Sequence, residues 1–260
     1  EEAVRREFVD DLLGGHSDGQ TLRELARQVG FNLAGTHRCV VASTHRPLRD
    51  AGPVQAHVES ALLDPRIGAG IIATKDGTLV CVMAADRADP GPTVLHHVSA
   101  AAPGTWRIGV GGAHPGAAGV ARSFGEAREA LDIARRLGLL EPISDFALLA
   151  PFRVLTQDMA VLNETVGAVL GPLSGARGGA EPLLETLEAY FDEGLSTTAA
   201  ARRLHLSARA VTYRLERIAT LTGRSLRDPR DRFILEVAIR GRHLLDLPFA
   251  AGSPHEERED

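Results

Sequence analysis

The pattern of apolar positions near the C-terminal end predicts two short helices joined by a tight turn within residues 196–218. Ala200 and Ala201 are small, so a second helix can cross closely over the first. Ser207 is a good N-cap for that second helix, because its hydroxyl can accept hydrogen bonds from free amides of the next turn. The apolar positions that follow share one helical face: Val211, Leu215 and Ile218. This pattern predicts a helix-turn-helix.

The opposite face of the same segment is polar and rich in arginine. An apolar inner face and a basic outer face are what insertion into a major groove requires. The residues expected to contact DNA are Arg202, Arg203, Ser207, Ala208, Arg209, Thr212, Tyr213, Arg214 and Arg217. The alternative is an ordinary helical hairpin with a solvated arginine face. We favour DNA binding because the small residues, the cap and the arginines fall together at the required offsets.

Upstream of this motif, helical and strand-like patterns alternate. Helices are expected over residues 3–13, 21–29, 53–63, 92–102, 123–137 and 161–170, and again after the glycine-rich break over 183–191 and 230–245. Strands are expected over 39–43 and 106–110, with a hairpin over 70–83. Asp76-Gly77 supplies the hairpin turn. This order predicts an α/β sandwich with helices on a central sheet, followed by an all-α helix-turn-helix domain.

These patterns divide the chain into five parts. We expect an N-terminal helical segment (1–35), an α/β domain (36–150), a helix with a flexible linker (151–180), a helical domain (181–248) and a disordered tail (249–260).

Charge is distributed unevenly along the chain. Residues 196–242 hold eleven arginines and four acidic residues, a net charge of +7. The whole chain has a net charge of −5, so the remainder carries −12. A basic segment on an acidic body concentrates the attraction for phosphate at one end.

Composition excludes several classes of protein. There is no run of about eighteen apolar residues, so we expect no membrane span, and the first eight residues lack the apolar core of a signal peptide. A cytoplasmic chain is therefore expected. Cys39 and Cys81 lie in apolar, strand-like runs, which favours buried inert thiols over the alternative of a redox pair.

Residues 183–245 resemble the C-terminal helix-turn-helix domain of the bacterial PucR/CdaR transcriptional regulators. The shared positions are Leu204-His205-Leu206, Val211, Tyr213-Arg214-Leu215, Ile218, Leu226 and Asp228-Pro229. Residues 207–210 read Ser-Ala-Arg-Ala, where that family commonly has His-Arg-Asn-Thr. The difference falls at the start of the recognition helix and leaves the expected fold intact.

Residues 36–150 resemble the middle domain of the same family, a degenerate relative of the GGDEF diguanylate cyclases. The resemblance rests on the glycine-rich stretch 107–119 and on the pattern of residues 123–131, with the helix at 8–14 leading into the domain. Cyclase chemistry needs a Gly-Gly-(Asp/Glu)-Glu turn to hold metal ions, whereas the hairpin turn here offers only Asp76 beside Lys75. We therefore expect no enzyme activity, no metal and no cofactor.

The glycine-rich loop 109–119 leads from a strand into a helix, an arrangement that can hold a small anion. The candidate ligand-binding residues are Gly111, Gly112, Arg122 and Ser123. The alternative is a tight strand-to-helix turn that belongs to the fold.

Taken together, these patterns predict a sequence-specific DNA-binding transcriptional regulator that responds to a small-molecule effector. Its partner would be double-stranded operator DNA. A homodimer or higher oligomer is expected, because one recognition helix reads only a few base pairs. The apolar faces of helices 3–13 and 123–137 offer surfaces for pairing, or form core. The alternative function is a ligand-sensing or protein-interaction module whose helical domain mediates assembly.

Overall fold

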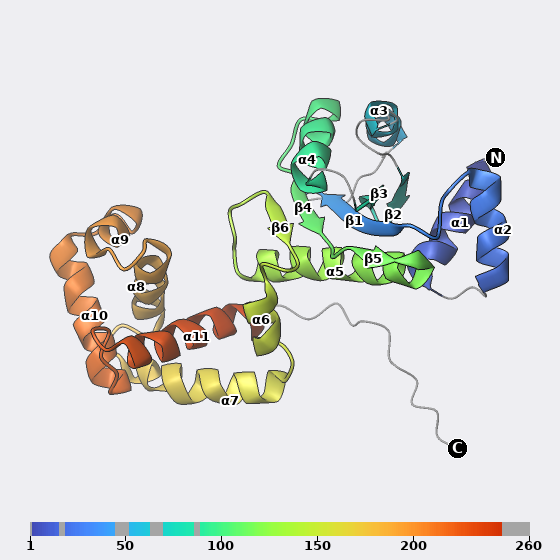
Figure 1. Ribbon diagram of the computed structural model, residues 1–260. Coiled ribbons are helices and arrows are strands. Elements are labelled where there is room, and N and C mark those ends of the chain that lie inside the picture. Colours follow the sequence, from blue (N-terminus) through green and yellow to red (C-terminus); the bar gives the residue numbers. More distant parts are fainter. Residues whose placement is uncertain (1, 16–18, 45–51, 63–69, 86–88, 246–260) are drawn as a thin grey trace, which may run out of the picture. The chain divides into compact units, whose positions relative to one another are not determined.

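The structure is a computed structural model that describes residues 2–15, 19–44, 52–62, 70–85 and 89–245 (Figure 1). Its contacts divide the chain into two compact units, Glu1–Arg153 and Val154–Asp260, which are described separately below. The tail expected at 249–260 lies outside the described residues. Within the described ranges, none of the helices combines the length and apolar character needed to cross a membrane.

The first unit is built on a sheet with the strand order β2-β3-β1-β4-β6, and a short strand, β5, pairs with the start of β1. The strands are β1 (Thr36–Ser43), β2 (Ile71–Lys75), β3 (Thr78–Ala84), β4 (Arg107–Val110), β5 (His114–Pro115) and β6 (Ile143–Asp145). Strand β6 pairs parallel to β4, and the other pairings given are antiparallel. The hairpin predicted from the sequence is confirmed. Asp76 and Gly77 have φ angles of 51° and 73°, and positive φ at both central residues is the requirement of a type I′ turn.

Helices cover both faces of this sheet (Figure 1). They are α1 (Glu2–Gly14), α2 (Gly19–Val29), α3 (Gly52–Leu62), α4 (Pro90–Ala101) and α5 (Gly116–Arg136), followed by α6 (Ala150–Leu155). Strand side chains alternate between the two faces. Cys39 and Val41 therefore pack with α1, α2 and α5, whereas Val40 and Ala42 pack with α3 and α4. The α/β sandwich expected from the sequence is confirmed.

The apolar faces of α1 and α5, considered above as pairing surfaces, are core in this unit. Phe8 and Leu12 of α1 are 0% and 1% exposed, and Phe124 of α5 belongs to the same cluster. These side chains are covered by their own chain. Helix α5 also begins at Gly116, seven residues before the predicted start at 123, so the end of the glycine-rich loop is helical.

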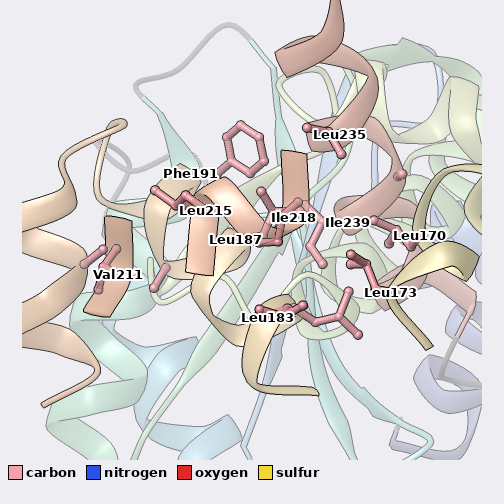
Figure 2. Packing of buried hydrophobic residues seen from close by; sticks show 14 of the residues in the cluster. Leu170, Leu173, Leu183, Leu187, Phe191, Val211, Leu215, Ile218, Leu235 and Ile239 are labelled. Carbon is pink, nitrogen blue, oxygen red and sulfur yellow. The ribbon is translucent and has the colours of Figure 1, made fainter. Parts of the chain in front are cut away.

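The second unit consists of helices only. They are α7 (Met159–Leu170), the short 3-10 helix η1 (Gly171–Gly175), α8 (Glu181–Asp192), α9 (Thr197–Arg203), α10 (Ala208–Thr222) and α11 (Pro229–Leu245). Figure 2 shows side chains from α7, η1, α8, α10 and α11 converging on one core. Leu170 and Leu173 belong to that core, so the part of the expected linker that contains α7 and η1 packs within this unit.

Replacing Val211 by Asp tests this core. Val211 is fully buried, so the substitution places an unpaired charge in an apolar site at a cost of about 3–5 kcal/mol. Such a loss approaches the whole stability of a small domain. Thermal unfolding should therefore show the second unit unfolded or strongly destabilised in the Val211→Asp variant. The matched control is Thr212→Asp, because Thr212 is exposed and should change stability by less than about 0.5 kcal/mol. Equal stability of the two variants would contradict the packing described.

Candidate nucleic-acid interface

A serine caps the N-terminus of each of the two helices α9 and α10. The hydroxyl of Ser196 accepts a hydrogen bond from the Ala199 amide at 3.2 Å, and that of Ser207 accepts one from the Ala210 amide at 3.1 Å. The predicted N-cap at Ser207 is therefore confirmed. Between the helices, His205 has a φ of 54° and the Leu206 amide donates to the Ala201 carbonyl at 2.9 Å, which closes the turn.

The inner faces of both helices are buried. Ala200 and Ala201 are 0% and 4% exposed, so α10 approaches α9 closely where these two side chains lie. The apolar positions of α10 face α8 and α11 in the same core: Val211, Leu215 and Ile218 (Figure 2). Because this face is buried, the opposite face of α10 points to solvent.

Most of the residues predicted to contact DNA are exposed, on α9, at the cap of α10 or on the outer face of α10. The exposed ones are Arg202, Arg203, Ser207, Ala208, Arg209, Thr212, Tyr213 and Arg217. Tyr213 is 68% exposed, unusually open for an aromatic side chain. The exposed face of α10 also includes Glu216, which is not among the residues predicted to contact DNA. A carboxylate in a major groove can accept from cytosine N4, so Glu216 belongs to the candidate interface.

Arg214 is placed differently from the prediction. Its guanidinium is half-buried and donates from Nη1 to the Pro182 carbonyl and to Thr186 Oγ1, both at 3.1 Å. Thr186 is fully buried and itself donates to the Pro182 carbonyl at 2.7 Å. Arg214 directly precedes Leu215 at the border of the apolar face, so its long side chain reaches α8 instead of the outer surface. It joins α10 to α8.

Arg203 is exposed, but it is balanced by acidic residues at the end of α8. It lies 2.9 Å from Asp192 and 3.7 Å from Glu193. Asp192 also pairs with Arg240 of α11 at 2.6 Å. Much of the charge of Arg203 is thus neutralised within the unit.

An ion pair and a histidine–carboxylate contact also join α8 to α11. Arg242 lies 3.1 Å from Glu181, and His243 lies 2.6 Å from Glu188. The hydrogen bond with His243 lowers the pKa of Glu188 below its ordinary value, and this outweighs the opposing effect of burial. These contacts hold together α8 and α11, the two helices against which α10 packs.

In the first unit, two of the four candidate ligand-binding residues, Gly112 and Arg122, bind Glu126. Its carboxylate accepts from the Gly112 amide at 2.8 Å and from Arg122 Nε at 3.0 Å, and His114 Nε2 lies 2.9 Å away. Ser123 accepts from the Cys39 amide and donates to the Gly112 carbonyl. The anion held by this loop is therefore a carboxylate of the chain itself.

The close packing of the loop supports this interpretation. A Cβ atom at Gly111 would lie 2.0 Å from the Ser123 carbonyl oxygen, and one at Gly112 would lie 2.7 Å from the Glu126 carboxylate. The glycines are needed because backbone and side chains approach one another here. The geometry favours a strand-to-helix turn that belongs to the fold.

Glu126 is charged within this site. Burial raises its pKa, but the hydrogen bonds with His114, the Gly112 amide and Arg122 together outweigh that effect and hold the pKa below its ordinary value.

The hairpin turn of the first unit, where a cyclase would hold metal ions, is tied to its neighbours. Lys75 lies 2.8 Å from Asp10 of α1, and Asp76 lies 3.6 Å from Arg128 of α5. The one carboxylate of the turn is thus paired with an arginine.

The geometry defines a chain with a helix-turn-helix unit and an α/β unit whose hairpin lacks the paired carboxylates of a cyclase. Comparison with known families agrees. Residues 14–133 match the GGDEF-like domain, and residues 183–241 match the PucR C-terminal helix-turn-helix domain. The chain therefore combines a GGDEF-like domain with a PucR-type helix-turn-helix domain.

Similar proteins cover parts of the chain. Uncharacterized proteins of Mycobacterium tuberculosis and Mycobacterium bovis are 40% identical over 90 residues, which is 35% of this chain and 21% of each relative. The purine catabolism regulatory protein of Bacillus subtilis is 35% identical over 65 residues, 25% of this chain and 12% of that protein. The alignments thus span about a fifth or less of the curated relatives.

One solved structure aligns along most of the chain. It is the crystal structure of a regulator of polyketide synthase expression from Bifidobacterium adolescentis. The alignment has a TM-score of 0.48 and 22% identity, and it covers 95% of this chain and 100% of that one.

The role of Glu126 can be tested by its pH dependence. Because the pKa of Glu126 is lowered in the folded state, its charged form contributes stability above the ordinary carboxyl pKa. That contribution is lost as the pH falls from about 5 through the lowered value. Glu126→Gln should therefore lose about 1–3 kcal/mol at pH 7 and much less at low pH. Urea unfolding, followed by the fluorescence of Trp106, measures the free energy of unfolding at both pH values, because Trp106 is buried in the same unit.

The matched control is Glu141→Gln, since Glu141 is exposed. This variant should follow the wild type at both pH values. If the deficit of the Glu126→Gln variant were as large at pH 3 as at pH 7, the carboxylate would not be the stabilising group.

Proposed function

We propose that this chain is a sequence-specific DNA-binding transcriptional regulator that inserts α10 into the major groove. One observation carries the proposal: the outer face of α10 presents Arg209, Tyr213 and Arg217 to solvent. Neither arginine has an ion pair with the described residues. An arginine-rich helix held by a buried opposite face suits base and phosphate contacts. The name of the Bacillus relative supports a regulatory role.

Within α10, Arg209 and Arg217 are assigned different tasks. Arg209 is two residues past the Ser207 cap, at the helix end that enters the groove in helix-turn-helix complexes. Its guanidinium can bond guanine O6 and N7 together. Arg217 lies about two turns further on, where the helix leaves the bases and approaches the backbone. Arg209 would thus read sequence, and Arg217 would hold phosphate.

Alanine substitution separates these two tasks. Arg209→Ala should cost about 1–3 kcal/mol on the best site and relax the preference at one base pair. Arg217→Ala should weaken all sequences alike and lower the salt slope by about one. The measurement is binding to a duplex selected from a random library and to its single-base variants. If the Arg209→Ala protein ranks the single-base variants of the duplex by affinity in the same order as the wild type, the assignment of Arg209 is contradicted.

For the GGDEF-like domain we propose a sensing role instead of catalysis, at a cavity of about 600 Å³ beside the end of β1 and the end of α5. Its lining includes Ser43, Arg107, Leu140 and Ser144, and none of the described residues that line it is acidic. Nη1 of Arg107 donates to two backbone carbonyls at 2.9 and 2.8 Å, which fixes the guanidinium. Ser144 is 6% exposed, whereas Leu140 is 83% exposed. The serine hydroxyls and the Arg107 guanidinium can bind a carboxylate, and the exposed Leu140 can contact an aliphatic chain. The cavity therefore suits a small carboxylate with an aliphatic chain.

Trp106, the single tryptophan of the chain, follows the lining residue Thr105 and provides the readout. Titration with hexanoate should change its fluorescence and saturate, whereas uncharged hexanamide should bind at least tenfold more weakly, because it cannot form the charged pair. Ser144→Val should weaken hexanoate binding, and Ser99→Ala, an exposed position on α4, should leave it unchanged. Equal responses to hexanoate and hexanamide would contradict this proposal without affecting the DNA-binding one.

A further inference from the structure

The eleven arginines of residues 196–242 are not equivalent in the structure. Five have a charged or polar partner within the second unit: Arg203, Arg214, Arg224, Arg240 and Arg242. Six make no side-chain ion pair or hydrogen bond with the described residues: Arg202, Arg209, Arg217, Arg227, Arg230 and Arg232. Three of these six lie on α9 and α10, and three lie around the connection to α11. The uncompensated charge therefore extends beyond the helix-turn-helix.

The acidic residues near the second group are already engaged. Asp228 caps α11, since its Oδ1 accepts from the amides of Arg230 at 2.8 Å and Asp231 at 3.0 Å. Asp231 accepts from the Ser225 amide at 2.8 Å and pairs with Arg224 at 3.5 Å. The side chains of Arg227 and Arg230 are exposed, and no acidic side chain in the described part of the chain pairs with them.

The position of this group follows from the length of α10. The helix has 15 residues and is about 22 Å long at 1.5 Å per residue, whereas the major groove is about 12 Å wide. A helix whose first turn contacts bases must therefore bring its other end to the edge of the groove, where phosphates lie. Gly223, with a φ of 68°, ends α10, and the chain passes directly into the start of α11 beside that end (Figure 1).

We propose that Arg227 and Arg230 form a second DNA-contact surface, which binds backbone phosphates flanking the sequence read by α10. The proposal rests on the proposed function, because it places this surface relative to a helix in the groove. The arginine side chains are the phosphate ligands here, since Asp228 already occupies amides at the start of α11. Contacts of this kind fix position and add affinity without reading sequence.

The test is the salt dependence of binding of the full chain to a 30-base-pair duplex of random sequence between about 50 and 200 mM salt, the range over which phosphate contacts are lost. Each phosphate contact contributes about 0.9 to the slope of log affinity against log salt. Arg227→Ala and Arg230→Ala should each lower that slope by about one, and the double variant by about two. Binding to a selected operator should weaken by the same factor as binding to the random duplex.

The matched control is Arg23→Ala, which removes an exposed arginine from α2 in the other unit. This variant should keep the wild-type slope, and circular dichroism should show all variants folded. If Arg217→Ala lowers the slope but Arg227→Ala and Arg230→Ala do not, the second surface is refuted and the proposed function stands. If the wild-type chain shows no salt-dependent binding to either duplex, the proposed function fails and this inference fails with it.

Discussion

The burial of Val211, Leu215 and Ile218 against the core of the second unit determines which way α10 faces. Once these three side chains point inward, the helical period leaves a complementary set of positions facing solvent. The serine caps set where α9 and α10 begin, and the small side chains of Ala200 and Ala201 let the helices cross closely. The candidate interface is thus a consequence of packing on the opposite, buried side of the helix.

Arginine serves two purposes in this unit, and the structure separates them. Arg214 is half-buried and donates hydrogen bonds to Thr186 and to the Pro182 carbonyl, so it holds α10 against α8. Arg209 and Arg217 are exposed and have no such partner among the residues that the structure describes. The net charge of +7 for residues 196–242 is therefore larger than the positive charge available to phosphates. Ion pairs such as that of Arg203 with Asp192 neutralise part of it.

The first unit uses an arrangement suited to anion binding for its own stability. Glu126 fills the loop that a small anion would otherwise occupy, and Arg128 pairs with the carboxylate of the hairpin turn. In both places the carboxylate is paired within the chain. The sensing role that we propose is therefore placed elsewhere in the domain, at the cavity beside Arg107.

Local patterns in the sequence were enough to predict the longer helices and strands, the Asp76-Gly77 turn and the Ser207 cap, because each depends on neighbouring residues. Contacts between distant residues were not predictable in this way. The pairing of Arg214 with Thr186 spans 28 positions, and nothing in the spacing of α10 indicates it. The strand β6 has three residues, too few to show a period, and exists because it pairs with β4. The inclusion of α7 in the second unit likewise depends on packing against α11, where Leu162 lies beside Gly241.

The most direct test of the central claim is a footprint of the full chain on duplex DNA that contains a sequence selected from a random library. If α10 reads the major groove, the chain should protect a defined segment, and two paired copies should protect two half-sites about one helical turn apart. Protection should disappear in the folded Arg209→Ala variant at a concentration where the wild type still protects. Failure of the folded wild-type chain to protect any segment, or uniform protection without sequence preference, would contradict the account.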